Sequence, residues 1–535
     1  MIKIVTLSLT PSQAFSENEV KKKLVEELSL SAKDELHILL QKRSVDSRQR
    51  NIKVNITVQV FINEPLVEEQ INFDYKNVSD AKQVFIIGAG PAGLFAALRC
   101  LELGLKPVIF ERGKDVQSRR RDLAALNKEH IVNPESNYCF GEGGAGTYSD
   151  GKLYTRSHKR GDVLKTLKTF VFHGAEKTIL ADAHPHIGTN KLPNIIVAIR
   201  ETILKHGGEI HFNSKLTDVI LEKNQPGGKA GKIYGVQIKS AGTEKEYATD
   251  NLLLATGHSA EDIYELFERK NILIEAKPFA MGVRVEHPQE IIDSLQYHCA
   301  NLDAVKSARE FLPASSYSLV HQVNGKGVYS FCMCPGGIIA PCATGSQSVV
   351  TNGWSPSKRN NPYANSGIVV GIDKNDWQKF SSQKELAGLR MQRELEKAAW
   401  LAGGKTQTAP SQRLQDFVNG KLSKDLPDCS YQPGLVSVDM KNVLGNMIAN
   451  SLKEGFIAFG KKMRGYLTNE ALIVGVESRT STPVRIPRDK ETCMHIQIEG
   501  LFPCGEGAGY AGGIVSAAMD GERCVDAIYT RIFKK

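Results

Sequence analysis

A glycine-rich turn between two apolar segments constrains this chain more than any other feature of its sequence. Residues 83–87 (QVFII) indicate a short buried strand, which leads directly into GAGPAG at residues 88–93. A helix-forming stretch, 94–103, follows, and a second apolar run, 107–110, ends at Glu111. Strand, Gly-x-Gly-x-x-Gly turn, helix, strand and acidic residue in this order predict a βαβ unit that binds a dinucleotide.

The residues of this turn have separate predicted roles. Gly88 permits a tight turn, Gly90 lets the backbone approach a pyrophosphate, and Gly93 lets the helix pack closely on the strand. Pro91 suits the first helical turn, where no N–H donor is required. The start of the helix offers free N–H groups to phosphates, and Glu111 is placed to accept hydrogen bonds from ribose hydroxyls.

Length and composition limit the class of protein. A chain of 535 residues exceeds what one core usually holds, so we expect two or three domains. No apolar run of about 18 residues occurs, which argues against a membrane span, and the start of the chain does not resemble a signal peptide. The ten cysteines are scattered, which favours a reducing cytoplasm. The net charge of +9 is small for this length, and nucleic-acid binding is an unlikely interpretation of it.

Two further segments favour FAD over NAD as the dinucleotide. Residues 255–257 (Ala-Thr-Gly) end an apolar strand that follows a β-meander, and small residues there let the chain pass a bound dinucleotide. Near the C-terminus a strand ends at Gly505-Glu506, and a helix begins near Gly513. The N-terminus of such a helix stabilises the negative charge of a reduced flavin, and an NAD domain has no need of this element.

A loop at residues 139–153 combines glycines with polar residues. Its core reads GEGGAGTYSDGKL, which is poor linker composition and indicates close backbone approach to a ligand, with Thr147 and Ser149 as donors. We therefore predict that this loop contacts the cofactor.

Taken together, these segments resemble the bacterial family of uncharacterised FAD-dependent dehydrogenases in the glutathione-reductase-like flavoprotein superfamily. The resemblance covers nearly the whole chain, and it also rests on residues 185–192 (PHIGTNKL), 277–284 (KPFAMGVR), 329–337 (YSFCMCPGG), 364–367 (ANSG) and 475–486 (GVESRTSTPVRI). It implies one FAD per chain and an oxidoreductase, with adenine near the backbone of Leu216 and the adenosine ribose held by Glu111. Glu506 stands where many relatives carry the shorter Asp.

The predicted fold is α/β: a doubly wound FAD-binding Rossmann-like domain with an inserted α+β substrate domain and a small N-terminal βαββ module. The predicted parts are the module at 1–80, the FAD-binding domain at 81–270 and 464–535, and the inserted domain at 271–463. The predicted cofactor-binding residues are Gly88, Gly90, Pro91, Ala92, Gly93, Glu111, Arg112, Gly143, Gly144, Gly146, Thr147, Lys152, Leu216, Ala255, Thr256, Gly257, Gly505, Glu506, Gly512, Gly513 and Ile514.

The predicted chemistry is hydride transfer between an organic substrate and the flavin. No second Gly-x-Gly-x-x-Gly unit occurs in 271–463, so NADH or NADPH would visit the flavin transiently or the substrate itself would deliver the hydride. Glu477 and Arg479 are the candidate catalytic pair: Arg479 would clamp a carboxylate and Glu477 would shuttle a proton. An interdomain ion pair is an equal alternative for both. Arg284 and Lys152 are weaker candidates of the same kind.

Other reactive side chains are weaker candidates for a catalytic or metal-binding role. Cys332 and Cys334 have one residue between them instead of the two of the usual redox motif, so buried structural thiols are the preferred interpretation. His184 and His186 lack a carboxylate cluster, and no metal is predicted. The alternative functions are a tRNA-modifying flavoprotein, which should bind nucleic acid in a salt-dependent manner, and a flavin-bearing redox sensor without turnover.

Overall fold

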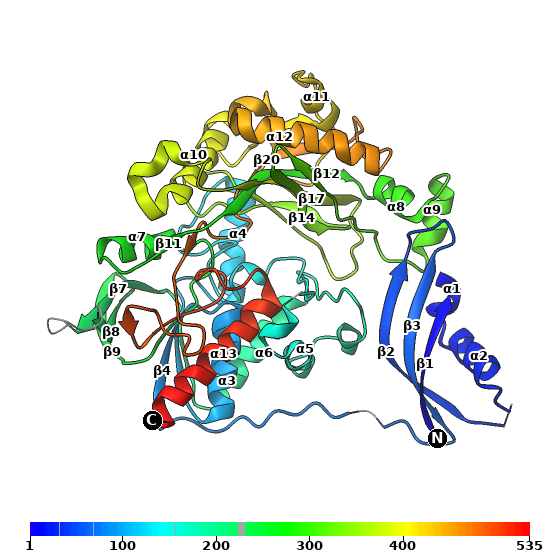
Figure 1. Ribbon diagram of the computed structural model, residues 1–535, viewed down its shortest axis with the longest axis horizontal. Helices are drawn as coiled ribbons and strands as arrows, with labels where there is room; N and C mark the ends of the chain where they lie inside the picture. The colour runs from blue at the N-terminus through cyan, green and yellow to red at the C-terminus, as the bar shows by residue number, and fades with distance from the viewer. Residues whose placement is uncertain (32, 68, 156, 223–230, 535) are drawn as a thin grey trace.

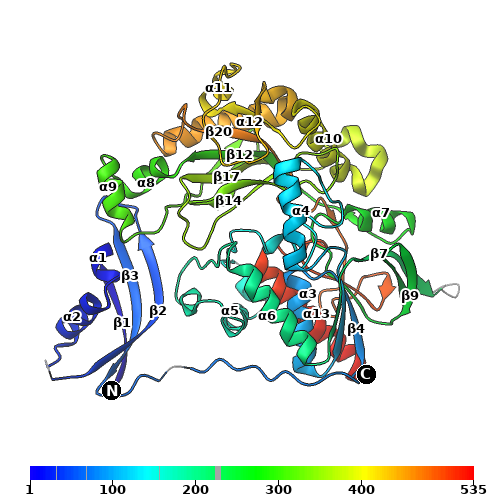
Figure 2. The same cartoon turned by 180° about the vertical axis from the view of Figure 1, so that it is seen from behind.

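The protein consists of an N-terminal module, a domain built on a parallel sheet, and a second sheet domain that lies over it (Figure 1). This computed structural model describes residues 1–31, 33–67, 69–155, 157–222 and 231–534. Seen from the front and from behind, the N-terminal module stands at one side of the molecule, below α8 (Gln289–Tyr297) and α9 (Leu302–Arg309) (Figure 2).

The N-terminal module is an antiparallel sheet of order β1-β3-β2 with helices on one face. Ser16 begins the main helix, since its hydroxyl accepts from the Glu19 N–H at 3.4 Å, and Val20 and Leu24 point into the core. The elements are β1 (Ile2–Leu9), α1 (Pro11–Ala14), α2 (Glu17–Leu28), β2 (Leu36–Asp46) and β3 (Lys53–Ile62). The order is the predicted βαββ, and the pairing of β2 with β3 continues to Asp46.

The central domain contains a parallel sheet of order β23-β10-β4-β5-β6. Alternate residues of the central strand enter different cores: Val84 and Ile86 face the helices, whereas Phe85 and Ile87 face the opposite layer. The strands are β4 (Gln83–Ile87), β5 (Lys106–Phe110), β6 (Glu209–His211), β10 (Leu252–Leu254) and β23 (Leu501–Pro503).

The two faces of this sheet are covered differently. On one face lie α3 (Pro91–Leu103), α5 (Val163–Phe172), α6 (Leu192–Lys205) and α13 (Ile514–Phe533). On the other lie β7 (Ser214–Glu222), β8 (Gly231–Ser240), β9 (Thr243–Ala248), β22 (Ile498–Glu499) and α7 (Glu261–Arg269). The doubly wound prediction is therefore corrected, because a β-meander replaces most of the second helical layer. The connections include α4 (Val116–Glu129), η1 (Gly144–Gly146), η2 (His158–Arg160) and η3 (Lys177–Leu180).

The second domain is a largely antiparallel sheet of order β13-β14-β17-β12-β20-β18-β19. Its strands are β12 (Phe279–Pro288), β13 (Val320–Val323), β14 (Lys326–Cys334), β17 (Tyr363–Ile372), β18 (Ala409–Arg413), β19 (Leu435–Ser437) and β20 (Leu472–Glu477). β15 (Ile338–Pro341) and β16 (Thr351–Trp354) form a separate pair.

Helices cover the outer face of this sheet, away from the central domain (Figure 1). They are η4 (Gln378–Leu386), α10 (Ala387–Ala402), α11 (Leu414–Asn419) and α12 (Met440–Lys462). α10 begins three residues after Lys384, whose φ of +48° is not helical. On β12, Val283 and Val285 face these helices, so Arg284 between them faces the central domain.

The connections between the two sheet domains lie side by side. β11 (Glu275–Ala276), where the chain leaves the central domain, pairs with β21 (Val484–Arg485), where it returns. The predicted boundary at 463/464 is wrong, since β20 lies between β12 and β18 in the second sheet. A buried apolar strand such as β20 carries no local signal of which sheet it joins. Within the described ranges, no helix combines the length and apolar character that crossing a membrane requires.

Candidate functional site

A cavity of about 400 Å³ lies along the carboxyl edge of the parallel sheet, under the second domain. Such an edge is where open α/β sheets bind ligands. Most predicted cofactor residues line it: Gly88, Gly90, Pro91, Ala92, Glu111, Arg112, Gly144, Gly146, Lys152, Leu216, Ala255, Thr256, Gly257, Gly505, Glu506, Gly512, Gly513 and Ile514. The fold therefore brings segments from both ends of the chain to one place.

Three predicted residues are outside the cavity lining and support the turn from behind. A Cβ on Gly93 would lie 1.9 Å from the Gly88 carbonyl oxygen, so this glycine permits the helix–strand packing that the motif predicts. The Gly143 N–H donates to the Ala89 carbonyl at 2.8 Å. The Thr147 hydroxyl is buried and donates to the Glu142 carbonyl at 2.8 Å, so its predicted role as a ligand donor is corrected.

One end of the cavity is made from backbone. α3 begins at Pro91 with Gly90 as its N-cap, so the N–H groups of its first turn lack helical partners and can bind an anion. Among the described residues, a Cβ on Gly90 would meet no heavy atom closer than 3.9 Å, the distance to Gly144 Cα. The two glycines thus leave open the space that a phosphate needs above the helix N-terminus.

Glu111 organises the turns around this end. Its carboxylate accepts from the N–H groups of Ala89 at 2.8 Å, Gly113 at 2.9 Å and Gly141 at 2.9 Å, and the side chain is 5% exposed. Arg112 beside it pairs with Glu135 and Asp262 and lies over the Phe140 ring. The acid borders the cavity, so its predicted contact with a ribose stays a prediction in addition to this structural role.

The opposite end of the cavity meets the N-terminus of α13. A Cβ on Gly512 or on Gly513 would meet no heavy atom of the described residues within 4 Å, so the backbone before this helix faces open space. Glu506 lies near His258, with 3.8 Å between the Glu506 carboxylate and Nε2. Burial lowers the pKa of His258, although the charge of Glu506 opposes this, so the imidazole is neutral at neutral pH.

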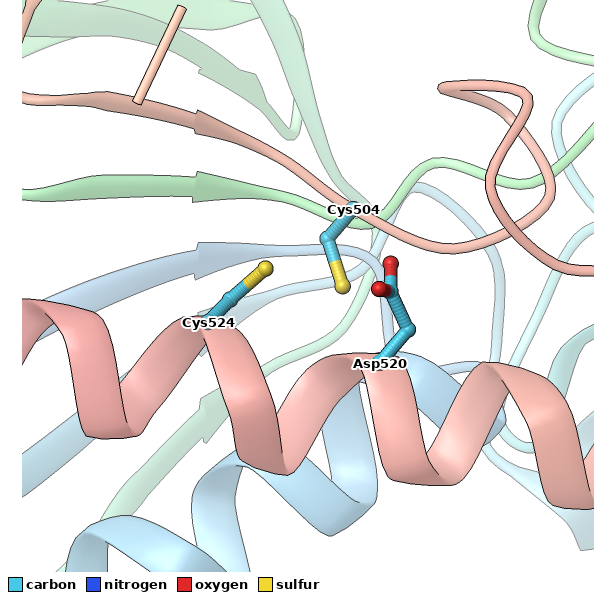
Figure 3. A group of neighbouring side chains, drawn as sticks. All are labelled: Cys504, Asp520 and Cys524. Carbon is cyan, nitrogen blue, oxygen red and sulfur yellow. The ribbon is translucent and has the colours of Figure 1, made fainter. Parts of the chain in front are cut away.

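Behind this end, Cys504, Asp520 and Cys524 converge, the two latter side chains coming from α13 (Figure 3). Arg488 already fills the cationic position: its guanidinium donates to Asp520 Oδ1 at 2.5 Å and to Cys524 Sγ at 3.1 Å. Burial raises the pKa of Cys504, which keeps it a thiol. The Arg488 guanidinium also donates to the Pro503 carbonyl at 2.7 Å, so this group is an ion pair that fastens α13 to the end of β23.

The candidate catalytic pair, Glu477 and Arg479, is already bound to protein partners. Arg479 donates to Glu396 through Nε at 2.9 Å and Nη2 at 2.8 Å, and it also reaches Glu261 of α7 at 3.3 Å. Glu477 accepts from Arg284 Nε at 3.0 Å, with both side chains at most 2% exposed. The geometry favours the ion-pair alternative: Arg479 bridges the two sheet domains, and Glu477 lies outside the lining of the main cavity.

Several cavity residues were not predicted from the sequence. The second domain contributes Phe331, Cys332, Asn352 and Thr480, and the central domain adds Asp150, Tyr154, Lys215, His258, Asp262 and others. Ser149, which was predicted as a donor, also borders the cavity. A signal existed for His258, which directly follows the Ala-Thr-Gly segment, and for Asp150 in the glycine-rich loop. Cys332 lies on a strand of the second domain, far from either fingerprint in the sequence.

Comparison with known proteins agrees with this architecture. Residues 278–480 match the family model described as "FAD-dependent protein, C-terminal domain-like", and residues 1–61 match a domain of unknown function. An uncharacterized protein of Clostridium beijerinckii is 38% identical over 533 residues, which cover 96% of each chain. The chain belongs to this bacterial family of FAD-dependent proteins.

The solved structures with a general likeness include several flavoproteins. The flavin-dependent brominase Bmp2 has a TM-score of 0.35 at 14% identity and covers 84% of this chain and 79% of its own. A flavoprotein/dehydrogenase from Cytophaga hutchinsonii scores 0.34 at 10% identity, and a flavocytochrome c3 fumarate reductase scores 0.32 at 11%; each covers 85% of this chain and 79% of its own. At such low scores, no reaction or substrate transfers to this family.

Proposed function

We propose that this chain binds one FAD and is an oxidoreductase that transfers a hydride between an organic substrate and the flavin. The observation that supports this most directly is the single cavity that joins the N-terminus of α3 to the N-terminus of α13. The N-terminus of each helix carries a partial positive charge. FAD has an anionic pyrophosphate and a ring that becomes negative on reduction, so each of these groups would be stabilised at one of the two helix N-termini.

Residues along the cavity would contact successive parts of FAD. Leu216 and Glu111 would border the adenosine, the first turn of α3 would hold the pyrophosphate, and Glu506 would face the ribityl chain. The open backbone at Gly512 and Gly513 would lie against the ring. The bound flavin would supply two-electron chemistry at N5, and the protein would supply orientation and electrostatics.

The second domain would cover the flavin site. Phe331, Cys332 and Asn352 border the cavity from its sheet, so a ring in this position would lie between the two domains and away from bulk water. NADH or NADPH remains a proposed transient reductant, which would have to enter at this domain interface.

The test is to purify the protein and identify any bound flavin after it is released by denaturation. We expect a yellow protein that contains one FAD per chain. Apoprotein should be stabilised more by FAD than by FMN or ADP, because only FAD reaches both helix ends. A ligand that binds more tightly raises the free energy of unfolding more. A colourless protein whose thermal unfolding does not respond to FAD would contradict the proposal.

A second measurement separates the two possible hydride sources. The yellow protein is mixed anaerobically with NADH or with NADPH, and the flavin absorbance is followed. Rapid bleaching by one of them would identify a nicotinamide-dependent enzyme. Unchanged absorbance with both would show that the organic substrate itself reduces the flavin.

A further inference from the structure

Two cysteines and a lysine meet where the second domain borders the cavity. Lys152 Nζ lies 3.8 Å from Cys332 Sγ and 3.5 Å from Cys334 Sγ. Lys152 and Cys332 line the cavity, whereas Cys334 is fully buried behind them. The lysine comes from the glycine-rich loop of the central domain and the cysteines from β14, so the domain interface creates this cluster.

The lysine is held in its charged form. Its ammonium lies 3.0 Å from the Asp150 carboxylate, which Arg359 also contacts at 2.8 Å. Burial lowers the pKa of Lys152, but the charges of Asp150 and of the two cysteines outweigh burial, and the pKa is raised. A permanent positive charge therefore faces both sulfur atoms.

The pKa values of the two cysteines are shifted in opposite directions. A hydrogen bond from the Cys334 thiol lowers the pKa of Cys332 well below its ordinary value; burial opposes this, and the charges of Lys152 and Arg284 add to it. The same hydrogen bond and burial raise the pKa of Cys334. The ammonium of Lys152 beside both sulfurs thus favours a thiolate in this pair, and a thiolate next to a thiol is the arrangement that thiol–disulfide chemistry requires.

The backbone of β14 is shaped around these cysteines. Its pairing with β17 is interrupted by a bulge between Phe331 and Cys334, and Cys332 has a left-handed φ of +48°. The Arg284 guanidinium fixes this conformation by donating to the Cys332 carbonyl at 3.0 Å. Bulges re-aim side chains and are over-represented next to active sites, and strained non-glycine residues cluster there too. A structural thiol pair needs neither feature.

We propose that Cys332 and Cys334 form a redox-active pair that exchanges two electrons with the flavin. The inference rests on the proposed FAD site. When the Cys332 thiolate and the Cys334 thiol join as a disulfide, two electrons and one proton leave them. Oxidised FAD takes up both electrons and the proton and becomes the anionic reduced flavin. The reverse reaction reopens the disulfide, so the chain holds two coupled two-electron centres. This replaces the interpretation of the pair as buried structural thiols.

The test combines thiol counting with reductive titration. Protein oxidised with diamide and protein reduced anaerobically with dithionite are denatured, and their free thiols are counted. The reduced chain should show all ten cysteines and the oxidised chain two fewer, with peptide mass spectrometry placing the bond between Cys332 and Cys334. The oxidised protein should consume a second equivalent of two-electron reductant beyond that needed by the flavin.

Three variants sharpen this result. In Cys334→Ser the thiol count should be equal in both states, and the second equivalent should disappear while the flavin stays bound. Cys299→Ser is the matched control, because Cys299 lies at the end of α8 outside the cavity lining, and it should keep the two-thiol difference. In Lys152→Met, alkylation of Cys332 by iodoacetamide should require a higher pH than in the wild type, because the thiolate loses its neighbouring charge.

Failure of the redox-pair proposal can be distinguished from failure of the FAD proposal. A yellow wild-type protein with equal thiol counts and a single reducing equivalent would overturn the redox pair and leave the FAD proposal intact. A disulfide that forms but stays oxidised while the flavin is reduced by dithionite would also overturn it, since the two centres would not exchange electrons. A colourless protein would overturn the flavin site as well.

Discussion

The α3 end of the cavity and the part under the second domain have different surfaces. At the α3 end, glycine backbone and helix N–H groups face the space, and the Glu111 carboxylate accepts from three backbone N–H groups there. Under the second domain, charged and sulfur-bearing side chains such as Lys152 and Cys332 face the space. Backbone groups can bind a ligand part that is common to a large superfamily. The chemistry of one family depends instead on specific side chains.

This difference predicts where substitutions act. The α3 end should be damaged when a side chain is added, and the domain interface should be damaged when a side chain is removed. The effects below run from the largest to the smallest.

Removal of Arg479 should have the largest effect. Its side chain is 9% exposed and that of its partner Glu396 is 2% exposed, and loss of one partner leaves the other charge buried without compensation. We expect Arg479→Ala to lower the free energy of unfolding by about 3–5 kcal/mol, measured by urea denaturation. Lys306→Ala removes an exposed pair and serves as the control, with a change within about 0.5 kcal/mol. Equal effects of the two variants would contradict the importance of the buried network.

Glu477 should make stability depend on pH. Burial raises its pKa from 4.5 to about 7, although Arg284 opposes this. The native state therefore retains a proton that the unfolded chain has already lost, so stability should fall as pH rises from about 4.5 to about 7 and then level off. The contribution is about 3 kcal/mol in total.

The measurement compares wild type with Glu477→Gln across this pH range. Glu142, whose pKa burial also raises to about 7, titrates in both proteins and cancels in the difference. The variant should show the shallower dependence on pH. If the stability of the two proteins depends on pH in the same way, Glu477 is ionised over the whole range because its ion pair with Arg284 keeps it charged.

Addition of a methyl group should have different effects at Gly93, which lies behind the α3 end of the cavity, and at Gly512, which lies at its α13 end. Gly93→Ala would place a Cβ 1.9 Å from the Gly88 carbonyl, so α3 must shift from β4; we expect a loss of about 1–3 kcal/mol and weaker FAD binding. Gly512→Ala meets no protein atom within 4 Å in the described chain, so stability should hold within about 0.5 kcal/mol. Thermal unfolding with and without FAD measures both, and a similar loss in the two variants would contradict this account.

Much of the fold and of the α3 end could be predicted because the signals are local. The helix begins at Pro91 and the C-terminal helix at Ile514, next to the predicted Gly513. The β-meander was recognised, but its position over the second face of the parallel sheet was not. The assignment of β20 also failed, since a short apolar strand pairs wherever the tertiary fold offers an edge.

The partners of the candidate catalytic side chains could not be predicted from the sequence, for a related reason. Glu477 and Arg479 stand together in the sequence, yet their partners come from β12, α7 and α10, which no spacing rule connects with them. Cys332 was interpreted as structural from its motif, and its ammonium neighbour lies 180 residues away in the sequence.

The sequence by itself determined the dinucleotide turn, the helix starts and the family, because glycine conformation and helix capping depend on residues that are neighbours along the chain. Only the tertiary structure decided which charges pair, which thiol borders the cavity and where one sheet domain ends. Burial and electrostatic pairing depend on distances between remote segments, and those distances exist only once the two sheets have packed together.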